Sequence, residues 1–163
     1  MNNLVVYPGT FDPIHNGHLD IIQRCHQIFP EVIVAILQNE EKQTLLSVAE
    51  RLDITRRLLE PLPNCRVVSF QGLLVDFMKR HKSHIIVRGL RAVSDFEYEF
   101  QMAMMNRHLE HSVETVFMVP AEKYTFLSSR VVKEVARLGG DVGDLVPGIV
   151  RDLLLKKFRP QSL

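Results

Sequence analysis

Five short apolar runs alternate along this chain with longer stretches that carry apolar residues on one side. The runs cover residues 4–7, 32–37, 66–70, 85–88 and 115–119. They are largely apolar throughout rather than alternating, which is typical of strands that are covered on both faces in a parallel sheet. Strand and helix therefore have to alternate, which restricts the chain to a few α/β arrangements.

The stretches between and after these runs have the spacing of helices. They cover residues 17–29, 48–59, 73–82, 95–109 and 129–138, with a last helix from about 147 to 157. Ser47 followed by Glu50 forms a capping box before the second of them. The pattern predicts an α/β fold: a single Rossmann-like doubly wound domain with a five-stranded parallel sheet flanked by helices. With 163 residues the chain fits one domain over 1–163, completed by C-terminal helices from about 128 to 158.

Charge and composition argue against several classes of partner. The net charge of +1 is balanced along the chain and does not indicate a nucleic-acid partner. No apolar run reaches about 18 residues, so no membrane segment is predicted. Cys25 and Cys65 form no CxxC pair and are interpreted as apolar residues of a reducing compartment. We therefore expect a cytoplasmic protein.

The turn after the first strand concentrates residues that can do chemistry. Residues 7–18 include a threonine, an aspartate, two glycines and the histidines His15 and His18. A helix is predicted to begin at about Gly17, and a helix N-terminus attracts phosphate through unpaired N–H groups and the helix dipole. An ordinary surface turn is the alternative for any one of these residues, but their crowding favours a site.

Other strand ends bring basic and hydroxyl residues to the same edge of the predicted sheet, where ligands of such folds bind. Arg88 and Arg91 follow the fourth strand and suit phosphate oxygens, although salt bridges to Asp95 or Glu97 are an alternative. Lys42 follows the second strand and would otherwise be a solvated loop charge. Ser128 and Ser129 precede a helix, where they cap it, bind an anion, or both.

Several catalytic motifs are missing from the sequence. It contains no GxxxxGK[ST] or GxGxxG loop and no GxSxG elbow, so P-loop enzymes, dinucleotide binders and serine hydrolases are not favoured. His15 and His18 are three residues apart, but no cysteine or acidic cluster completes a metal site. We therefore predict no metal held by protein ligands alone.

The first turn resembles a known signature. His15-x-Gly17-His18 is similar to the (H/T)xGH motif of the nucleotidylyltransferase superfamily, and residues 7–13 resemble the bacterial phosphopantetheine adenylyltransferases. The resemblance continues to about residue 138, through 47–51, 88–93, 95–99, 105–109, 127–129 and 132–136. The chain differs from the common pattern at His15 (often Thr), Glu40 (commonly Pro) and Arg130 (commonly Ser).

The resemblance implies an activity and a set of site residues. Members transfer the adenylyl group of ATP to 4′-phosphopantetheine, giving dephospho-coenzyme A and pyrophosphate, with Mg2+, as homohexamers. His18 would stabilise the transition state. The residues implied for the acceptor are Thr10, Lys42, Leu74 and Arg88. The residues implied for ATP are Thr10, Phe11, His18, Gly89, Leu90, Arg91, Glu99, Tyr124, Thr125, Phe126, Leu127, Ser128, Ser129 and Arg130.

Two alternatives stay open at this point. One is a related nucleotidylyltransferase that acts on another phosphorylated acceptor. The other is a non-catalytic nucleotide-binding module, which would need the phosphate-binding turn but not His18. Pyrophosphate release from ATP in the presence of several acceptors would distinguish all three.

The stretch 95–109 gives an independent indication of self-association, because it carries two apolar stripes. The stripes are Phe96, Phe100, Ala103 and Met104, and Tyr98, Met102, Met105 and Leu109. One stripe can cover the sheet, and the other, if exposed, would mark a protein interface. The alternative is that the last helix, with Ile149, Val150, Leu153 and Leu154, covers the second stripe within one subunit.

Overall fold

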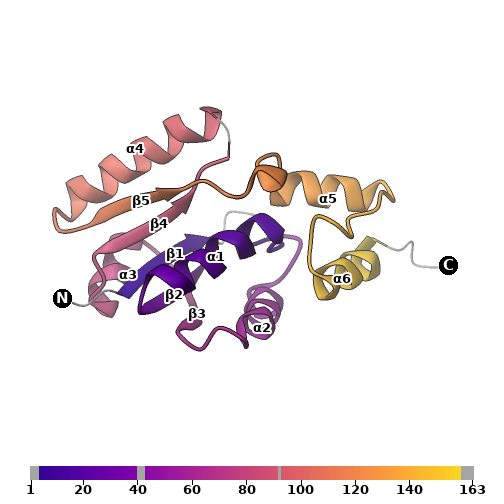
Figure 1. Cartoon of the computed structure of the whole chain (residues 1–163), viewed down its shortest axis with the longest axis horizontal. Helices are drawn as coiled ribbons and strands as arrows, with labels where there is room; N and C mark the ends of the chain where they lie inside the picture. The colour runs from indigo at the N-terminus through magenta and orange to yellow at the C-terminus, as the bar shows by residue number, and fades with distance from the viewer. Residues whose placement is uncertain (1–3, 40–42, 92, 159–163) are drawn as a thin grey trace.

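The structure is a computed structural model that describes residues 4–39, 43–91 and 93–158 (Figure 1). Its strands are β1 (Leu4–Gly9), β2 (Glu31–Leu37), β3 (Cys65–Phe70), β4 (Ile85–Gly89) and β5 (Glu114–Met118). Its helices are α1 (Asn16–Ile28), α2 (Val48–Leu59), α3 (Leu74–His81), α4 (Val93–Leu109), the 3-10 turn η1 (Glu122–Tyr124), α5 (Ser129–Arg137) and α6 (Gly148–Phe158). The predicted strands and helices are confirmed, with bounds that agree to within two residues.

All strand pairs are parallel, and the sheet order is β3-β2-β1-β4-β5. β1 pairs with β2 along its whole length, from Leu4 opposite Glu31 to Gly9 opposite Ile36. With β4 it pairs at Val5 and Val6. The strand order reverses between β1 and β4, which is where doubly wound sheets bind ligands. The turn that follows β1 therefore emerges at this switch point.

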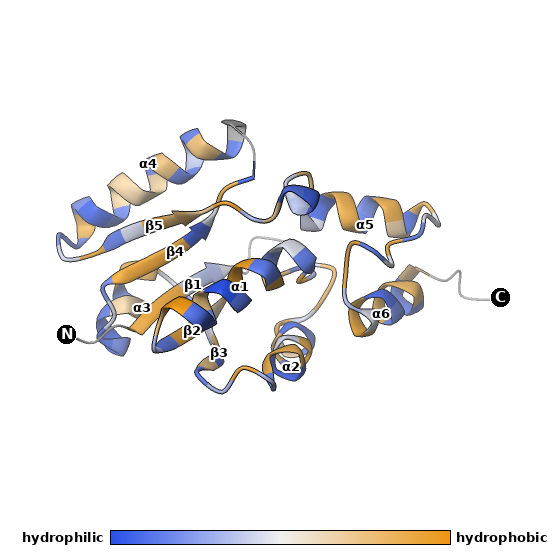
Figure 2. Ribbon diagram, in the orientation of Figure 1, coloured by the Kyte–Doolittle hydropathy of each residue, from blue (hydrophilic) through white to orange (hydrophobic). Residues whose placement is uncertain are grey.

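The central strands β2, β1 and β4 are buried on both faces, as their continuous apolar runs predict, whereas the edge strands β3 and β5 keep exposed residues. Side chains of β1 alternate between the two cores, because successive residues of a strand point to opposite faces. Val5 and Tyr7 belong to the core under α1, α2, α5 and α6, whereas Leu4 and Val6 belong to the core under α3. Figure 2 shows the apolar residues gathered on the strands and on the helix sides that meet them.

Helix α4 is the exception, since its apolar residues stay exposed. Phe96, Tyr98, Phe100, Met104 and Met105 are each between 45% and 62% exposed. Helix α6 lies at the other end of the molecule beside α5 (Figure 1), and its Val150 and Leu154 are buried in the first core. The alternative in which the last helix covers α4 is therefore wrong, because the apolar side of α6 is already buried in the first core.

Within the described ranges, no helix combines the length and the apolar character that crossing a membrane requires.

Candidate active site

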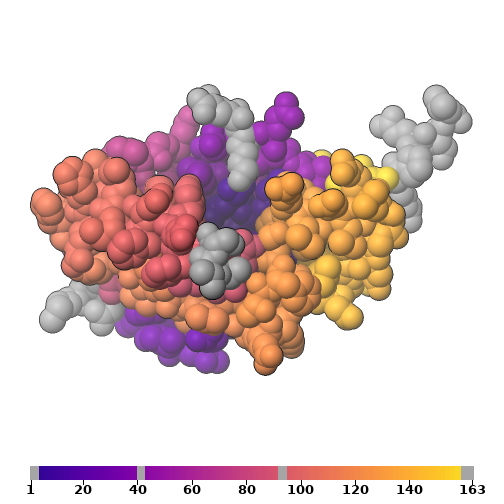
Figure 3. Space-filling model, turned by 90° about the horizontal axis from the view of Figure 1, so that it is seen from above, coloured from indigo at the N-terminus to yellow at the C-terminus, as the bar shows by residue number. Residues whose placement is uncertain are grey.

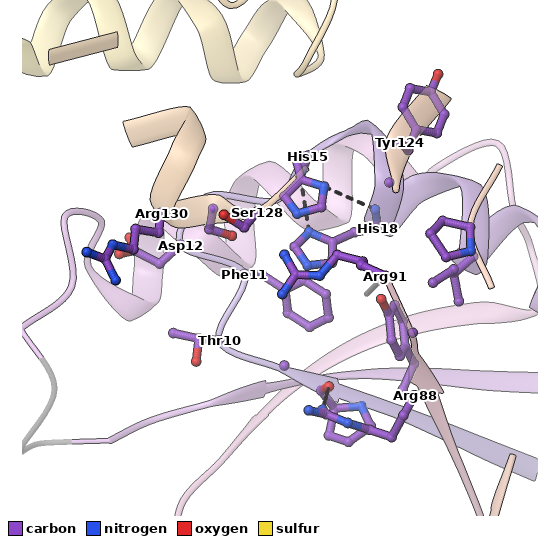
Figure 4. Close-up of a pocket in the computed structure, with 18 of the residues that line it drawn as sticks. Thr10, Phe11, Asp12, His15, His18, Arg88, Arg91, Tyr124, Ser128 and Arg130 are labelled. Atoms are coloured by element: carbon purple, nitrogen blue, oxygen red, sulfur yellow. Dashed lines mark hydrogen bonds between the residues drawn. The ribbon is translucent and has the colours of Figure 1, made fainter. Parts of the chain in front are cut away.

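The first turn of α1 is closed by two histidines. His15 is the N-cap, and its Nδ1 accepts from the backbone N–H of His18 at 3.4 Å. In return, Nδ1 of His18 accepts from the backbone N–H of His15 at 3.2 Å. The two rings stack with their centroids 3.6 Å apart (Figure 4). Because Nδ1 is the acceptor in both rings, the proton of each neutral imidazole lies on Nε2.

Both imidazoles are held neutral. Burial lowers the pKa of His15 to about 3, and the positive charge of Arg91 acts in the same direction. Burial also lowers the pKa of His18 well below 6.5, helped by His15, Arg91 and Arg88. His18 therefore offers a neutral Nε2–H donor at neutral pH. It does not act as a cation.

The buried His15 should make the protein sensitive to acid. Unfolded His15 binds a proton below pH 6.5, whereas the folded residue does so only near 3. Stability is therefore lost as pH falls through 6.5, by about 1.4 kcal/mol between about pH 7.5 and about pH 5.5. His15→Asn keeps a side-chain acceptor at the N-cap and removes the proton. Urea unfolding at both pH values should show that the wild type loses about 1.4 kcal/mol more than this variant.

His111→Asn is the matched control, since it removes an exposed imidazole outside this turn. It should lose as much stability on acidification as the wild type. An equal loss in wild type and His15→Asn would contradict a neutral buried His15.

A cavity of about 490 Å3, called here the first cleft, opens at the carboxyl end of β1 and β4. Seen from above, the molecule is hollowed between α4 and the segment of η1 and α5 (Figure 3). The predicted ATP residues that line this cleft are Thr10, Phe11, His18, Gly89, Arg91, Glu99, Tyr124, Ser128, Ser129 and Arg130 (Figure 4). The fold thus brings together residues from β1, α1, β4, α4 and α5.

Four of the residues implied for ATP lie outside the lining of this cleft. Leu90 extends the pairing of β4 with β5, because its N–H donates to Met118 O at 2.9 Å. Leu127 is fully buried, and Thr125 donates its hydroxyl to Glu122 O at 2.8 Å. Phe126 is 63% exposed. Their contact with the nucleotide stays a prediction.

A second cavity of about 490 Å3, the second cleft, adjoins the first. The two share Pro8, Gly9, Thr10, Arg88 and Glu99. Three of the residues predicted for the acceptor, Thr10, Leu74 and Arg88, line it. Its other walls are largely apolar, from Leu37, Phe70, Leu73, Tyr98, Met102, Ala103, Met105 and Leu109. Lys42 and Glu40, which the sequence also singles out, lie outside the described residues.

Arg88 stands on the wall between the two clefts. Its Nε donates to Glu99 Oε2 at 2.7 Å, its Nη2 reaches Glu99 Oε1, and its Nη1 donates to Pro8 O at 2.6 Å. A carboxylate that receives two parallel N–H groups fixes the guanidinium plane. Pro8 lies beyond Val5 and Val6, the β1 residues that pair with β4. Arg88 therefore donates a hydrogen bond to a β1 carbonyl outside the paired stretch.

Arg91 and the start of α5 are tied to each other. Arg91 Nε donates to Asp95 at 2.9 Å, so the salt bridge expected as an alternative is confirmed. Its Nη1 donates to Leu127 O at 2.6 Å. Ser128 caps α5 by accepting from Val131 N–H at 3.1 Å, and Ser129 Oγ donates to Pro13 O at 2.8 Å. These bonds hold the N-terminus of α5 over the first cleft.

Three charged residues of this region were not assigned roles from the sequence. Asp12 and Lys133 line the first cleft and pair with each other, with Nζ and Oδ2 2.6 Å apart. Arg51 is buried in α2 and donates to Thr10 O at 2.7 Å and to Leu37 O at 3.1 Å. One signal was available for Arg51, since it lies three and four residues before the buried Ile54 and Thr55 on the same helix face.

The described residues contain no group of three or more His, Cys, Asp or Glu side chains placed to hold a metal ion. The carboxylates that line the first cleft are Asp12 and Glu99, and each is paired with a cation. The cleft is instead lined by basic residues, histidines and hydroxyls, which suit an anion.

Comparisons with known proteins find similar sequences and a similar fold. The Cytidylyltransferase-like family matches residues 6–135. The phosphopantetheine adenylyltransferase of Dictyoglomus turgidum is 54% identical over 94% of this chain and 96% of that protein. The enzyme of the same name from Methylococcus capsulatus is 51% identical over 97% of this chain and 98% of its own length. The solved Plasmodium falciparum nicotinic acid mononucleotide adenylyltransferase with NaAD has a TM-score of 0.73 at 13% identity, covering 96% of each chain, which indicates the same fold.

Proposed function

This chain belongs to the phosphopantetheine adenylyltransferases, within the cytidylyltransferase-like nucleotidyltransferases, and we infer from this that it transfers the adenylyl group of ATP to 4′-phosphopantetheine. The products are dephospho-coenzyme A and pyrophosphate, in the biosynthesis of coenzyme A. One observation about the site supports this most strongly. The first and second clefts share Thr10, Arg88 and Glu99, so two ligands that occupy them meet at one wall.

The chemistry requires alignment and charge stabilisation more than a base. The acceptor phosphate is already ionised near neutral pH, so one of its oxygens can attack the α-phosphorus of ATP directly. A bond forms between that oxygen and the α-phosphorus. The bond from the α-phosphorus to its bridging oxygen breaks, and the electron pair leaves with pyrophosphate. We assign His18 to donate its Nε2–H to an α-phosphate oxygen as charge develops there.

The clefts suggest how the two substrates divide the site. ATP would occupy the first cleft, against Phe11, His18, Gly89, Arg91 and the first turn of α5. The acceptor would occupy the second, with its phosphate near Arg88 and Thr10 and its apolar arm along Leu74. We keep Lys42 as a further acceptor contact on the basis of the family resemblance alone.

Mg2+ is proposed to arrive with ATP. This ion usually takes one or two carboxylates at most and completes its shell with phosphate oxygens and water. A cleft whose carboxylates are already paired with Arg88 and Lys133 fits an ion held mainly by the nucleotide. When bound, the ion would offset the negative charge of the triphosphate.

A panel of acceptors tests the function. Pyrophosphate release from ATP should be fast with 4′-phosphopantetheine and at background level with nicotinic acid mononucleotide or with no acceptor. Release with another phosphorylated compound instead would indicate a sister enzyme. Nucleotide binding without release in any mixture would indicate a non-catalytic module.

We also propose that the protein is a homo-oligomer, with the hexamer of the resemblance as the expected number. The support is the exposed apolar stripe of Phe96, Phe100 and Met104 on α4, which lies outside the lining of both clefts. Such a patch is characteristic of an interface, and self-contacts usually close into symmetric assemblies. The cytoplasmic location expected from the sequence is proposed along with it.

Light scattering at micromolar concentration should give a mass several times 18.8 kDa. Phe100→Glu places a charge in the apolar face and should shift the protein to smaller species. Gln27→Glu, which adds the same charge on the exposed side of α1, should leave the mass unchanged. A wild type that stays near 18.8 kDa would rule out the interface.

A further inference from the structure

We propose that Lys133 is an additional ligand of the phosphates that leave as pyrophosphate, and that Asp12 is the positioning residue that holds it. The inference rests on the proposed adenylyl transfer and adds to it a residue outside the set implied for ATP. It arises from one buried carboxylate that joins three parts of the chain at the first cleft.

The carboxylate of Asp12 is fixed in position. It is 4% exposed and accepts from the backbone N–H groups of Leu45 at 3.0 Å and Leu46 at 2.8 Å. Its Oδ2 also accepts from Lys133 Nζ at 2.6 Å. A carboxylate held by two backbone donors cannot rotate away, so the ammonium that pairs with it is held as well. Asp12 therefore restricts a lysine that would otherwise sample many rotamers.

Lys133 is placed to reach a ligand. It lines the first cleft together with Asp12, Ser129 and Arg130, and lies one turn beyond Ser129 on α5. Figure 4 shows Asp12 on the same side of the cleft as Ser128 and Arg130. The Lys133 side chain is 29% exposed. An ammonium has three donors, and within the described residues one of them goes to Asp12, which leaves two for a bound anion.

The reaction places negative charge where this ammonium can act. When the bond to the α-phosphorus breaks, the electron pair stays on the departing pyrophosphate, whose charge grows during the step. Two arginines of the cleft, Arg88 and Arg91, are each held by a carboxylate on the side of β4 and α4, whereas Arg130 lies on α5 with Lys133. Lys133 is on the opposite side, at α5, so it suits the β- and γ-phosphates better than the α-phosphate.

A purely structural alternative is that the Asp12–Lys133 ion pair only holds α5 against the turn after β1. The two roles differ in what they do to one ligand. If Lys133 is only structural, its loss should weaken folding and the binding of all ligands alike. If Lys133 binds pyrophosphate, its loss should weaken the binding of ATP and pyrophosphate but not of dephospho-coenzyme A. The reverse reaction, in which dephospho-coenzyme A and pyrophosphate give ATP and 4′-phosphopantetheine, measures the KM for both ligands in one assay.

Lys133→Gln should raise the KM for pyrophosphate on the order of ten- to a hundredfold, the usual effect of losing one charge-assisted hydrogen bond. The KM for dephospho-coenzyme A should not change. Arg137→Gln removes the same charge from an exposed position on the same helix and should leave both constants unchanged. Lys133→Arg keeps the charge and should recover much of the pyrophosphate affinity.

The double variant Asp12→Asn with Lys133→Gln separates the two roles further. It removes the buried charge that Lys133→Gln leaves without a partner, so its thermal stability should exceed that of the single variant. Its KM for pyrophosphate should remain high. A normal KM in the double variant, or an equal rise for both ligands in Lys133→Gln, would overturn the inference. A wild type that forms no ATP in this assay would overturn the proposed function, and the inference with it.

Discussion

Replacing His18 by alanine should lower kcat by a factor on the order of a hundred to a thousand, with little change in the KM for ATP. The reason is the neutral Nε2–H donor that the reciprocal capping bonds leave directed away from the helix. A donor of this kind strengthens only as charge develops on the α-phosphate, so its loss raises the barrier more than it weakens the ground state. Steady-state kinetics with both substrates measures the two constants separately.

The same substitution has a structural cost that a control must remove. Alanine at position 18 cannot accept from the His15 N–H, and it loses the edge contact with Phe11, whose ring centroid is 5.0 Å away. Losing a cap typically destabilises a protein by about 1 kcal/mol. Unfolding curves should therefore confirm that the variant is folded under assay conditions. His111→Ala, an exposed histidine outside both clefts, should keep normal kcat. Near-normal kcat in His18→Ala, or a change confined to KM, would refute the assignment.

The second large effect is expected for Arg88→Ala, which should weaken 4′-phosphopantetheine binding about a hundredfold and leave ATP binding within a few-fold. Arg88 lies on the wall of the second cleft, where the acceptor phosphate is proposed to bind. Its removal also leaves the Glu99 carboxylate, 12% exposed, without its partner and Pro8 O without a donor. We expect a loss of about 2–3 kcal/mol in the free energy of unfolding.

Calorimetry with each substrate distinguishes the loss of a ligand contact from general destabilisation. Adding Glu99→Gln to Arg88→Ala removes the unpaired charge, so stability should recover in part while acceptor binding stays weak. The single Glu99→Gln variant provides the reference for ATP binding. An equal loss of affinity for both substrates in Arg88→Ala would refute the division of the site into two clefts.

The sequence predicts most of the fold because the relevant signals are local. Apolar runs without alternation predict buried parallel strands, and Ser47 with Glu50 forms the capping box expected at α2. The N-terminal cap of α1 is harder to predict from the sequence. Histidine is not a usual N-cap residue, so the reciprocal bonds of His15 and His18 are not expected from propensity.

The parts of the site that escaped prediction depend on contacts between distant segments. Asp12 and Lys133 are 121 residues apart in the chain, and Arg51 reaches Thr10 across 41 residues. No periodicity links such positions, so their pairing emerges only from the fold. The packing of α6 was ambiguous for a similar reason. Its apolar residues could pack against the exposed residues of α4 or against the first core. The structure buries Val150 and Leu154 in the first core.

Adenylyl transfer moves the α-phosphorus of ATP, with its nucleoside, onto the acceptor phosphate. The most direct test uses ATP labelled with phosphorus-32 at the α position in one reaction and at the γ position in another, each with 4′-phosphopantetheine. Adenylyl transfer predicts that the α label appears in dephospho-coenzyme A and that the γ label appears in pyrophosphate. Transfer of the γ label to the acceptor, or an acceptor product without the α label, would show that the protein does not transfer the adenylyl group.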